Sequence, residues 1–268
     1  MAATELLRYS ETEHPNNVEK ASSSSVDSSV FLTAEWRHLV MLNYEVDPAI
    51  LRRFVPGGTE LDTWHGKTFI SLVGFRFLNT RIRFLRKMGI SIPFHRNFDE
   101  VNLRFYVRRL HAGEIRRGVV FIREFVPRAA IAFIARAFYN ERYSATPMTH
   151  QISTDTTASK VEYRWKSKSG WNALSLTSNA ASVAPEEGTL PQFITEHYWG
   201  YSRSRDGSSV EYQVEHPAWR VRNAHTSAFD GNARELYGAE FADPLSGPPA
   251  SALLAEGSEV KVFRGRRL

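Results

Sequence analysis

The sequence predicts an α+β protein dominated by β-structure, built as an antiparallel β-barrel or cone with a few short helices. Three observations lead to this expectation. About ten runs have the alternation or the β-branched and aromatic composition of strands. Helical spacing is confined to a few brief segments. After about residue 30, no shift in composition marks a domain boundary, so the strands should form one unit.

Residues 1–30 are expected to form a disordered leader and residues 31–268 a single domain. The stretch "ASSSSVDSSV" is polar and of low complexity, and the leader has no apolar signal core. No run of about 18 apolar residues occurs, so we expect no membrane association through a helix. The chain has no cysteine, which excludes disulfides and thiolate metal sites and is compatible with a cytoplasmic location, the one we expect.

The first half of the domain reads as strands with a few interruptions. "EWRHLVMLNYEV" predicts a strand, and Asp47 with Pro48 should begin a short helix. A hairpin is expected around His65-Gly66, followed by a basic loop from about Asn79 to Asn97.

"DEVNLRFYVRR" is the clearest strand in the sequence, and "HAG" turns it into the antiparallel strand "EIRRGVVFIREFV". Next, "PRAAIAFIARAFY" has the spacing of an amphipathic helix. The second half predicts further short strands, a helix capped by Thr189 that ends near His197, a small helix at "NARELYG" and a last strand "EVKVFRG".

No motif for a cofactor or metal was found. A glycine-rich phosphate loop, a dinucleotide fingerprint and a histidine pair at helical spacing are all missing, so we predict no cofactor and no metal. A metal site assembled from residues distant in sequence stays open. The net charge of +5 is a weak signal for nucleic acid, and the cluster Arg81, Arg83, Arg86 and Lys87 is either a solvated face or a contact for an anionic partner.

Several segments, taken in order, resemble the YqjF-like proteins, domain of unknown function 2071. They are "LDTWHGKTFISLVGFRF", "DEVNLRFYVRR", "YNERYSATPM", "FITEHYWGYSR" and "HPAW". The resemblance spans roughly residues 31 to 264. It implies the fold of the acetoacetate decarboxylase-like superfamily, a β-rich barrel or cone with a central pocket.

The resemblance also implies where the decarboxylase chemistry would be. In acetoacetate decarboxylase a lysine forms a Schiff base with the substrate, next to a second lysine that lowers its pKa. That pair follows a proline in a segment resembling "YSATPM", whereas Met148, Thr149 and His150 follow Pro147 in this sequence. The pocket is therefore expected without its nucleophile.

The polar face of the "DEVNLRFYVRR" strand supplies the candidate site. Glu100, Asn102, Arg104 and Tyr106 either face solvent or point into a lumen. In a lumen, the guanidinium of Arg104 would suit a carboxylate.

Tyr139, Arg142, Tyr143 and His150 would lie near the same mouth if the decarboxylase comparison holds. Each tyrosine could equally be a half-buried core residue. Glu196 and His197 are adjacent on a helix, which favours helix surface over an acid–base pair. His216 is expected in a turn.

Three functions remain open from the sequence, the last of them nucleic-acid binding through the loop from Arg81 to Lys87. The first is a pocket that binds or transforms a small organic acid, with Arg104 as anchor and Glu100 or His150 as the proton-transfer group. The second is a non-catalytic interaction or scaffold protein on the same fold. The sequence does not indicate an oligomeric state.

Overall fold

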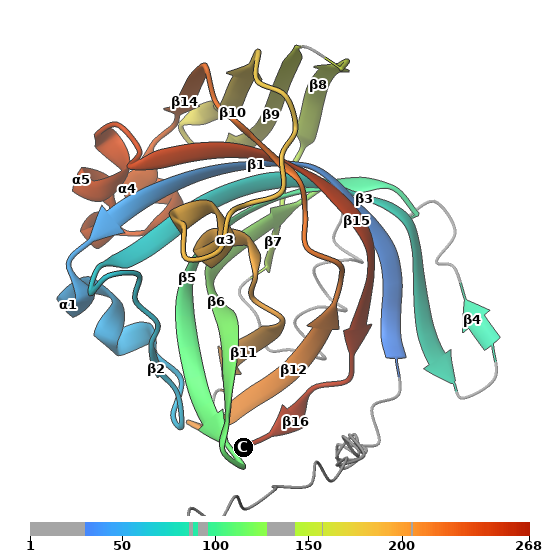
Figure 1. Cartoon of the computed structure of the whole chain (residues 1–268), viewed down its shortest axis with the longest axis vertical. Helices are drawn as coiled ribbons and strands as arrows, with labels where there is room; N and C mark the ends of the chain where they lie inside the picture. The colour runs from blue at the N-terminus through green and yellow to red at the C-terminus, as the bar shows by residue number, and fades with distance from the viewer. Residues whose placement is uncertain (1–29, 86–87, 91–95, 128–142, 157, 205) are drawn as a thin grey trace, which may run out of the picture.

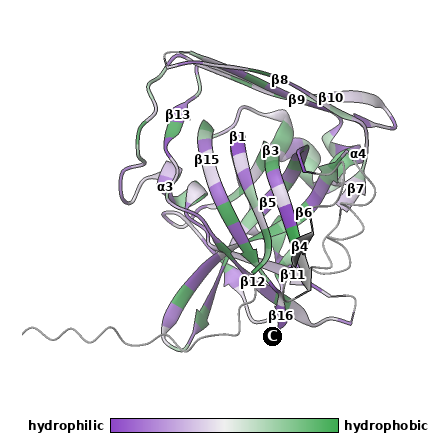
Figure 2. Cartoon of the chain, turned by 90° about the vertical axis from the view of Figure 1, so that its right-hand side faces the viewer, coloured by the Kyte–Doolittle hydropathy of each residue, from purple (hydrophilic) through white to green (hydrophobic). Residues whose placement is uncertain are grey.

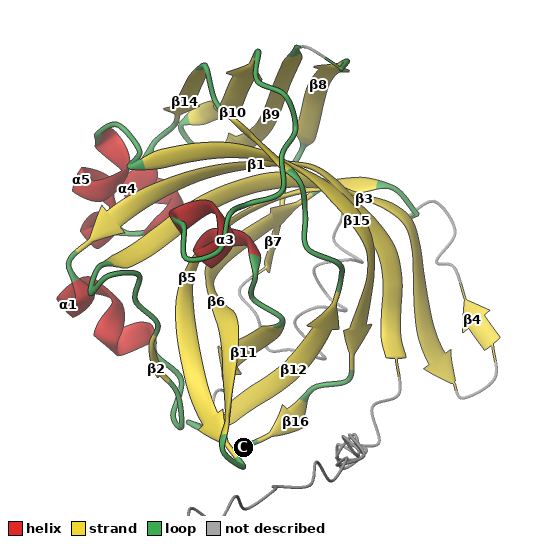
Figure 3. Ribbon diagram, in the orientation of Figure 1, coloured by secondary structure: helices red, strands yellow, loops and turns green. Residues whose placement is uncertain are grey.

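The computed structural model describes residues 30–85, 88–90, 96–127, 143–156, 158–204 and 206–268. Strands dominate the described chain, and the helices are short (Figure 3). The strands are β1 Val30–Val46, β2 Glu60–Leu61, β3 Thr68–Leu85, β4 Met88–Ile90, β5 Phe98–His111, β6 Glu114–Val126, β7 Tyr143–Ala145, β8 Met148–Thr154, β9 Ser159–Ser167, β10 Gly170–Ser178, β11 Trp199–Arg203, β12 Ser209–Glu215, β13 Val221–Asn223, β14 Thr226–Asp230, β15 Ser251–Phe263 and β16 Arg266–Arg267. The helices are α1 Pro48–Leu51, α3 Leu190–Thr195, α4 Ala233–Tyr237 and α5 Ala242–Ser246, with 3₁₀ turns at Arg52–Phe54 and Ala239–Phe241.

The large sheet curls into a cone. Its strand order is β13-β15-β1-β3-β5-β6-β11-β12-β16, and β12 also pairs with β15, so the path turns back on itself (Figure 1). Most neighbours are antiparallel, as the sequence predicts, but β6 pairs in parallel with β7 and with β11. The inside of this cone is where the candidate site lies.

A second sheet covers the outer side of the cone. It has the order β14-β10-β9-β8 and lies across β1 and β3 in Figure 1. Tyr163 and Trp165 of β9 and Leu174 of β10 are fully buried against the large sheet, together with α4 and α5. Gly74 of β3 permits the close approach, because a Cβ at this position would meet the Tyr163 ring at 2.7 Å.

The strand β5 is buried on both faces, although its sequence alternates between polar and apolar residues. Val101, Leu103 and Phe105 pack outward against the second sheet. Glu100 and Arg104 point the other way, into the cone, and are only 2% and 9% exposed. Figure 2 shows the same alternation of hydrophilic and hydrophobic residues along the strands of the large sheet.

Several local predictions are confirmed. The Asp47 carboxylate accepts a hydrogen bond from the Ala49 amide at 2.7 Å and caps α1, with Pro48 at the first helical position. His65 and Gly66 both have positive φ, as a tight hairpin turn requires, between the bridged residues Trp64 and Lys67. The strands β5 and β6 are antiparallel neighbours.

Other predictions need correction. The segment expected as a loop from Asn79 to Asn97 instead continues β3 to Leu85, and β4 pairs back onto it. Thr189 precedes α3, but its hydroxyl donates to the Glu186 carbonyl and does not cap the helix. The leader up to residue 29, most of the helix predicted at 127–139, and Arg86 with Lys87 lie outside the described residues.

Candidate functional site

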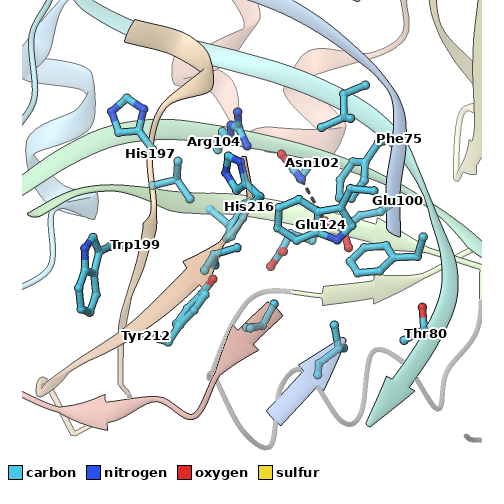
Figure 4. Close-up of a pocket in the computed structure, with 18 of the residues that line it drawn as sticks. Phe75, Thr80, Glu100, Asn102, Arg104, Glu124, His197, Trp199, Tyr212 and His216 are labelled. Carbon is cyan, nitrogen blue, oxygen red and sulfur yellow. Dashed lines mark hydrogen bonds between the residues drawn. The ribbon is translucent and has the colours of Figure 1, made fainter. Parts of the chain in front are cut away.

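A cavity of about 130 Å³ lies inside the cone. Its carboxyl and guanidinium side chains come from β5 and β6, and much of its apolar lining comes from β1, β3, β12 and β15. Figure 4 shows the side chains of Glu100, Asn102 and Arg104 projecting from β5 toward His216 and Glu124. The cavity therefore has a charged wall within a mostly apolar enclosure.

Arg104 is a buried cation without a protein counter-ion in the described part of the chain. Its Nε is buried and has no hydrogen-bond partner, and no described carboxylate forms an ion pair with its guanidinium. Its guanidinium carbon lies 5.8 Å from the centroid of the Tyr106 ring. A buried charge without a partner carries a cost in folding free energy.

Glu100 lies on the same face of β5, two residues from Asn102. One carboxylate oxygen accepts a hydrogen bond from the Asn102 amide at 3.0 Å, and the other accepts from the Tyr143 hydroxyl at 3.3 Å. Burial raises the pKa of Glu100 to about 7, against the lowering effects of these two hydrogen bonds and of the Arg104 charge. This carboxyl group can therefore gain or lose a proton near neutral pH.

His197 follows the last turn of α3 and is buried in the cavity wall. Its Nε2 lies 3.4 Å from the Asp62 carboxylate, which also accepts a 2.7 Å hydrogen bond from Arg117. Its ring packs against Tyr106, with centroids 4.5 Å apart. Burial lowers the pKa of His197 to about 4 in spite of Asp62, so the imidazole is neutral at physiological pH.

Glu124 reaches the cavity because of an irregularity in β6. The register passes from Arg104 opposite Phe121 to Leu103 opposite Arg123, which leaves Ile122 as an extra residue. Phe121 and Glu124 consequently line the cavity, whereas Ile122 and Phe125 pack in the outer core. Strict alternation from Phe121 would have placed Arg123 there instead.

The family model of the uncharacterized conserved proteins called DUF2071 matches residues 33–259. The chain belongs to the DUF2071 family. The uncharacterized protein YqjF of Bacillus subtilis (strain 168) is 28% identical over 227 residues, which cover 82% of this chain and 88% of YqjF.

Solved structures place this DUF2071 protein in a known fold. Acetoacetate decarboxylase from Legionella pneumophila matches with a TM-score of 0.60 and 11% identity, over 98% of each chain. The enduracididine biosynthesis enzyme MppR, solved in complex with pyruvate, matches with a TM-score of 0.59 and 14% identity, over 92% of this chain and 93% of its own. At such identities the likeness establishes the fold alone, which is the acetoacetate decarboxylase-like fold that the sequence predicts.

The structure brings some of the predicted site residues of this DUF2071 protein together. Glu100, Asn102, Arg104 and Tyr143 all line the cavity. Tyr106 also points into the cone, but its hydroxyl is 2.5 Å from that of Ser71 and its ring is covered by Phe193 and His197. It is a core residue beside the cavity. Tyr139 and Arg142 lie outside the described residues.

His150 is not brought to the cavity. The sequence predicts it near the mouth, but β8 belongs to the second sheet, on the other side of β5. There its Nδ1 lies 2.8 Å from the Asp99 carboxylate, and Arg76 is on the opposite oxygen at 3.4 Å. The Met148–His150 segment, where the resemblance implies the decarboxylase amine, is therefore outside the cone.

Three residues of the cavity wall were missed by sequence reasoning. His197 was expected on a helix surface, but α3 ends at Thr195 and the next residues run into the cone. His216 was expected in a turn, and its ring in fact stacks on Trp219 at 4.1 Å beside the cavity. Glu124 lies in a predicted strand, and only the extra residue in β6 turns it inward.

Within the described ranges, no helix is long and apolar enough to cross a membrane. The same residues contain no cluster of three histidine or carboxylate side chains placed to hold a metal ion.

Proposed function

We propose that this DUF2071 protein binds a small organic acid in the cavity of its cone, and that Arg104 holds the carboxylate. The observation that carries the proposal is a guanidinium, 9% exposed, that faces a cavity and has no anionic partner among the described residues. A bound carboxylate would supply the missing counter-charge and two parallel hydrogen bonds.

The electrostatics around Arg104 favour an anion. Burial dominates the lowered pKa values of His197 and His216, and the Arg104 charge lowers both further, so neither histidine adds a competing cation at neutral pH. Glu100 has a pKa of about 7, so it is partly protonated there and only partly offsets the arginine. MppR, which has this fold, was solved with pyruvate bound, so the fold can enclose a 2-oxo acid.

Schiff-base chemistry is not part of the proposal. None of the described residues that line the cavity is a lysine. An acid held by Arg104 would instead have Glu100 beside it, a carboxyl group able to donate or accept a proton near neutral pH. We therefore propose non-covalent binding, with proton transfer by Glu100 as the chemistry that the site can add.

Replacing Arg104 by methionine should abolish or strongly weaken acid binding without destabilising the free protein. Affinity for the best acid in a panel of 2-oxo, 3-oxo and hydroxy acids should fall by roughly 10- to 100-fold, since a charge-assisted hydrogen bond is lost. The midpoint of thermal unfolding without ligand should stay the same or rise, because an unpaired buried cation is replaced by an apolar chain. Calorimetric titration and thermal melts measure the two effects.

Arg108→Met is the matched control. Arg108 lies four residues along β5, and its guanidinium pairs at the surface with Glu60 at 2.8 Å. It should leave acid binding unchanged. If no acid in the panel binds and Arg104→Met is as silent as the control, the proposal fails and the alternative of a non-catalytic scaffold protein takes its place.

A further inference from the structure

We infer that the acid bound in this cavity carries an apolar body about the size of an aromatic ring, so that small polar acids such as pyruvate are poor ligands. The inference rests on the proposed function and names the class of its ligand. It is carried by the part of the cavity wall that Arg104 and Glu100 do not occupy.

Aromatic side chains form a large part of that remaining wall. Trp36 meets Phe75 and Phe77 edge to face, with centroids 5.5 and 5.7 Å apart, and Phe77 stacks on Phe98 at 4.5 Å. Trp219 continues the surface, 6.2 Å from Trp36. All five of these rings line the cavity. Their mutual contacts hold them in place, so the surface that they present to a ligand is already formed.

The charged and the aromatic parts of the wall come largely from different strands and meet near the start of β5. Arg104 stands in the middle of β5, Glu100 near its start and Glu124 near the end of β6. The aromatic groups come from β1, β3, the start of β5 and the segment after β12. A ligand that satisfied both parts would have an anionic end and an apolar end.

The cavity is close in size to one that holds a single aromatic ring. A cavity of about 150 Å³ lined by apolar side chains can hold benzene, and the space here is about 130 Å³. An acid as small as pyruvate would bind Arg104 and leave the aromatic wall without contacts. Its binding would therefore lack the free energy that dispersion contacts and apolar burial against this wall can contribute.

Matched pairs of ligands test the inference on the wild-type chain. Pyruvate is compared with phenylpyruvate, and acetate with phenylacetate, by calorimetric titration. Each aromatic acid should bind roughly 10- to 100-fold more tightly than its small partner, because each buried carbon adds to the affinity. Equal or tighter binding of the small acids would overturn the inference and leave the proposed function standing.

Phenylacetamide separates the two proposals, because it keeps the ring and removes the charge. If it binds much more weakly than phenylacetate, the acid anchor is supported, and the pair acetate and phenylacetate decides on the apolar body. If it binds as tightly, the acid anchor and with it the proposed function fail, while the apolar site is supported. If none of these compounds binds, both proposals fail.

A variant that fills the apolar end provides an independent readout. Val214 of β12 lines the cavity and is 7% exposed. Val214→Phe should reduce phenylpyruvate affinity by roughly 10-fold or more, by occupying its space, and should change pyruvate affinity little. Parallel losses for both acids, with an unchanged unfolding midpoint, would contradict separate acid and apolar ends. The ligand pairs on the wild-type chain decide the question if this variant does not fold.

Discussion

Replacing Glu211 by glutamine should lower the free energy of unfolding by about 3 kcal/mol. Glu211 of β12 is completely buried. Its carboxylate accepts hydrogen bonds from Arg109 at 3.0 Å, from Arg116 at 2.8 Å and from Arg266 at 2.6 and 2.9 Å. The Tyr201 hydroxyl donates a further one at 3.0 Å.

The reason is the charge that would be left behind. Burial alone would raise the pKa of Glu211, but Arg266 and Arg116 outweigh it and hold that pKa below the usual value, so the group is ionised in the folded protein. Without it, the three guanidinium groups would face one another around a neutral amide. Arg116 is the least exposed of the three, with 10% of its side chain accessible, so its charge would be the least well solvated.

This cluster also joins distant parts of the chain. Arg109 and Arg116 come from the end of the β5–β6 hairpin, and Arg266 comes from β16, which pairs with β12 beside Glu211. Loss of Glu211 should therefore loosen the C-terminal strand from the cone as well as reduce stability.

Glu215→Gln is the matched control for urea-induced unfolding. Glu215 lies four residues along β12 and pairs with Lys261 at 3.0 Å, with both side chains more than half exposed. It should cost less than about 1 kcal/mol. The double variant Glu211→Gln/Arg116→Met should recover part of the loss, because it removes the most buried of the stranded charges. A loss at Glu211 no larger than that at Glu215 would contradict this account.

The sequence predicted the framework of this fold because strands of a cone carry their signal locally. The alternation in β5 and β6 and the turn between them are readable from adjacent residues, and so is the Asp47 cap. The face of β5 that lines the cavity was left open, because Val101 and Arg104 are both buried and alternation only says that they differ in direction.

The rest of the site depends on features that local pattern does not encode. An extra residue at Ile122 moves Glu124 to the inner face, and no local pattern in "FIREFV" indicates this irregularity. His197 is buried because α3 is short and its exit leads into the cone, which is a matter of packing against Tyr106 and Phe193. His150 is remote because its strand joins the second sheet, whose placement is set by long-range contacts.

Single substitutions at Glu100 and His197 should reveal two opposite dependences of stability on pH, each of about 3 kcal/mol. Glu100 has a pKa of about 7 in the folded protein, above the usual 4.5, so it contributes stability that is fully present below pH 4.5 and lost as the pH rises through 7. His197 has a folded pKa of about 4, below the usual 6.5, so its contribution is present above pH 6.5 and lost as the pH falls through 4.

In the wild-type protein these two contributions run in opposite directions across nearly the same pH range and largely cancel. Relative to wild type, Glu100→Gln should therefore gain stability as the pH rises from 4.5 to 7, and His197→Asn should gain it as the pH falls from 6.5 to 4. The double variant should follow the wild-type pH dependence closely. Urea unfolding at half-unit steps between pH 4 and 7.5 measures all four proteins.

Glu45→Gln serves as the control for removing a carboxylate, because Glu45 is exposed and pairs with Lys67 at the surface. It should change the stability by less than about 1 kcal/mol, because a surface ion pair contributes little. Should Glu100→Gln run parallel to wild type at every pH, the pKa of Glu100 would be the same in the folded and unfolded protein, and its carboxyl group would be ionised at neutral pH. Arg104 would then have a permanent counter-charge beside it, and the argument for an incoming carboxylate would lose its electrostatic basis. The pH series on Glu100 therefore tests the proposed function without requiring any ligand.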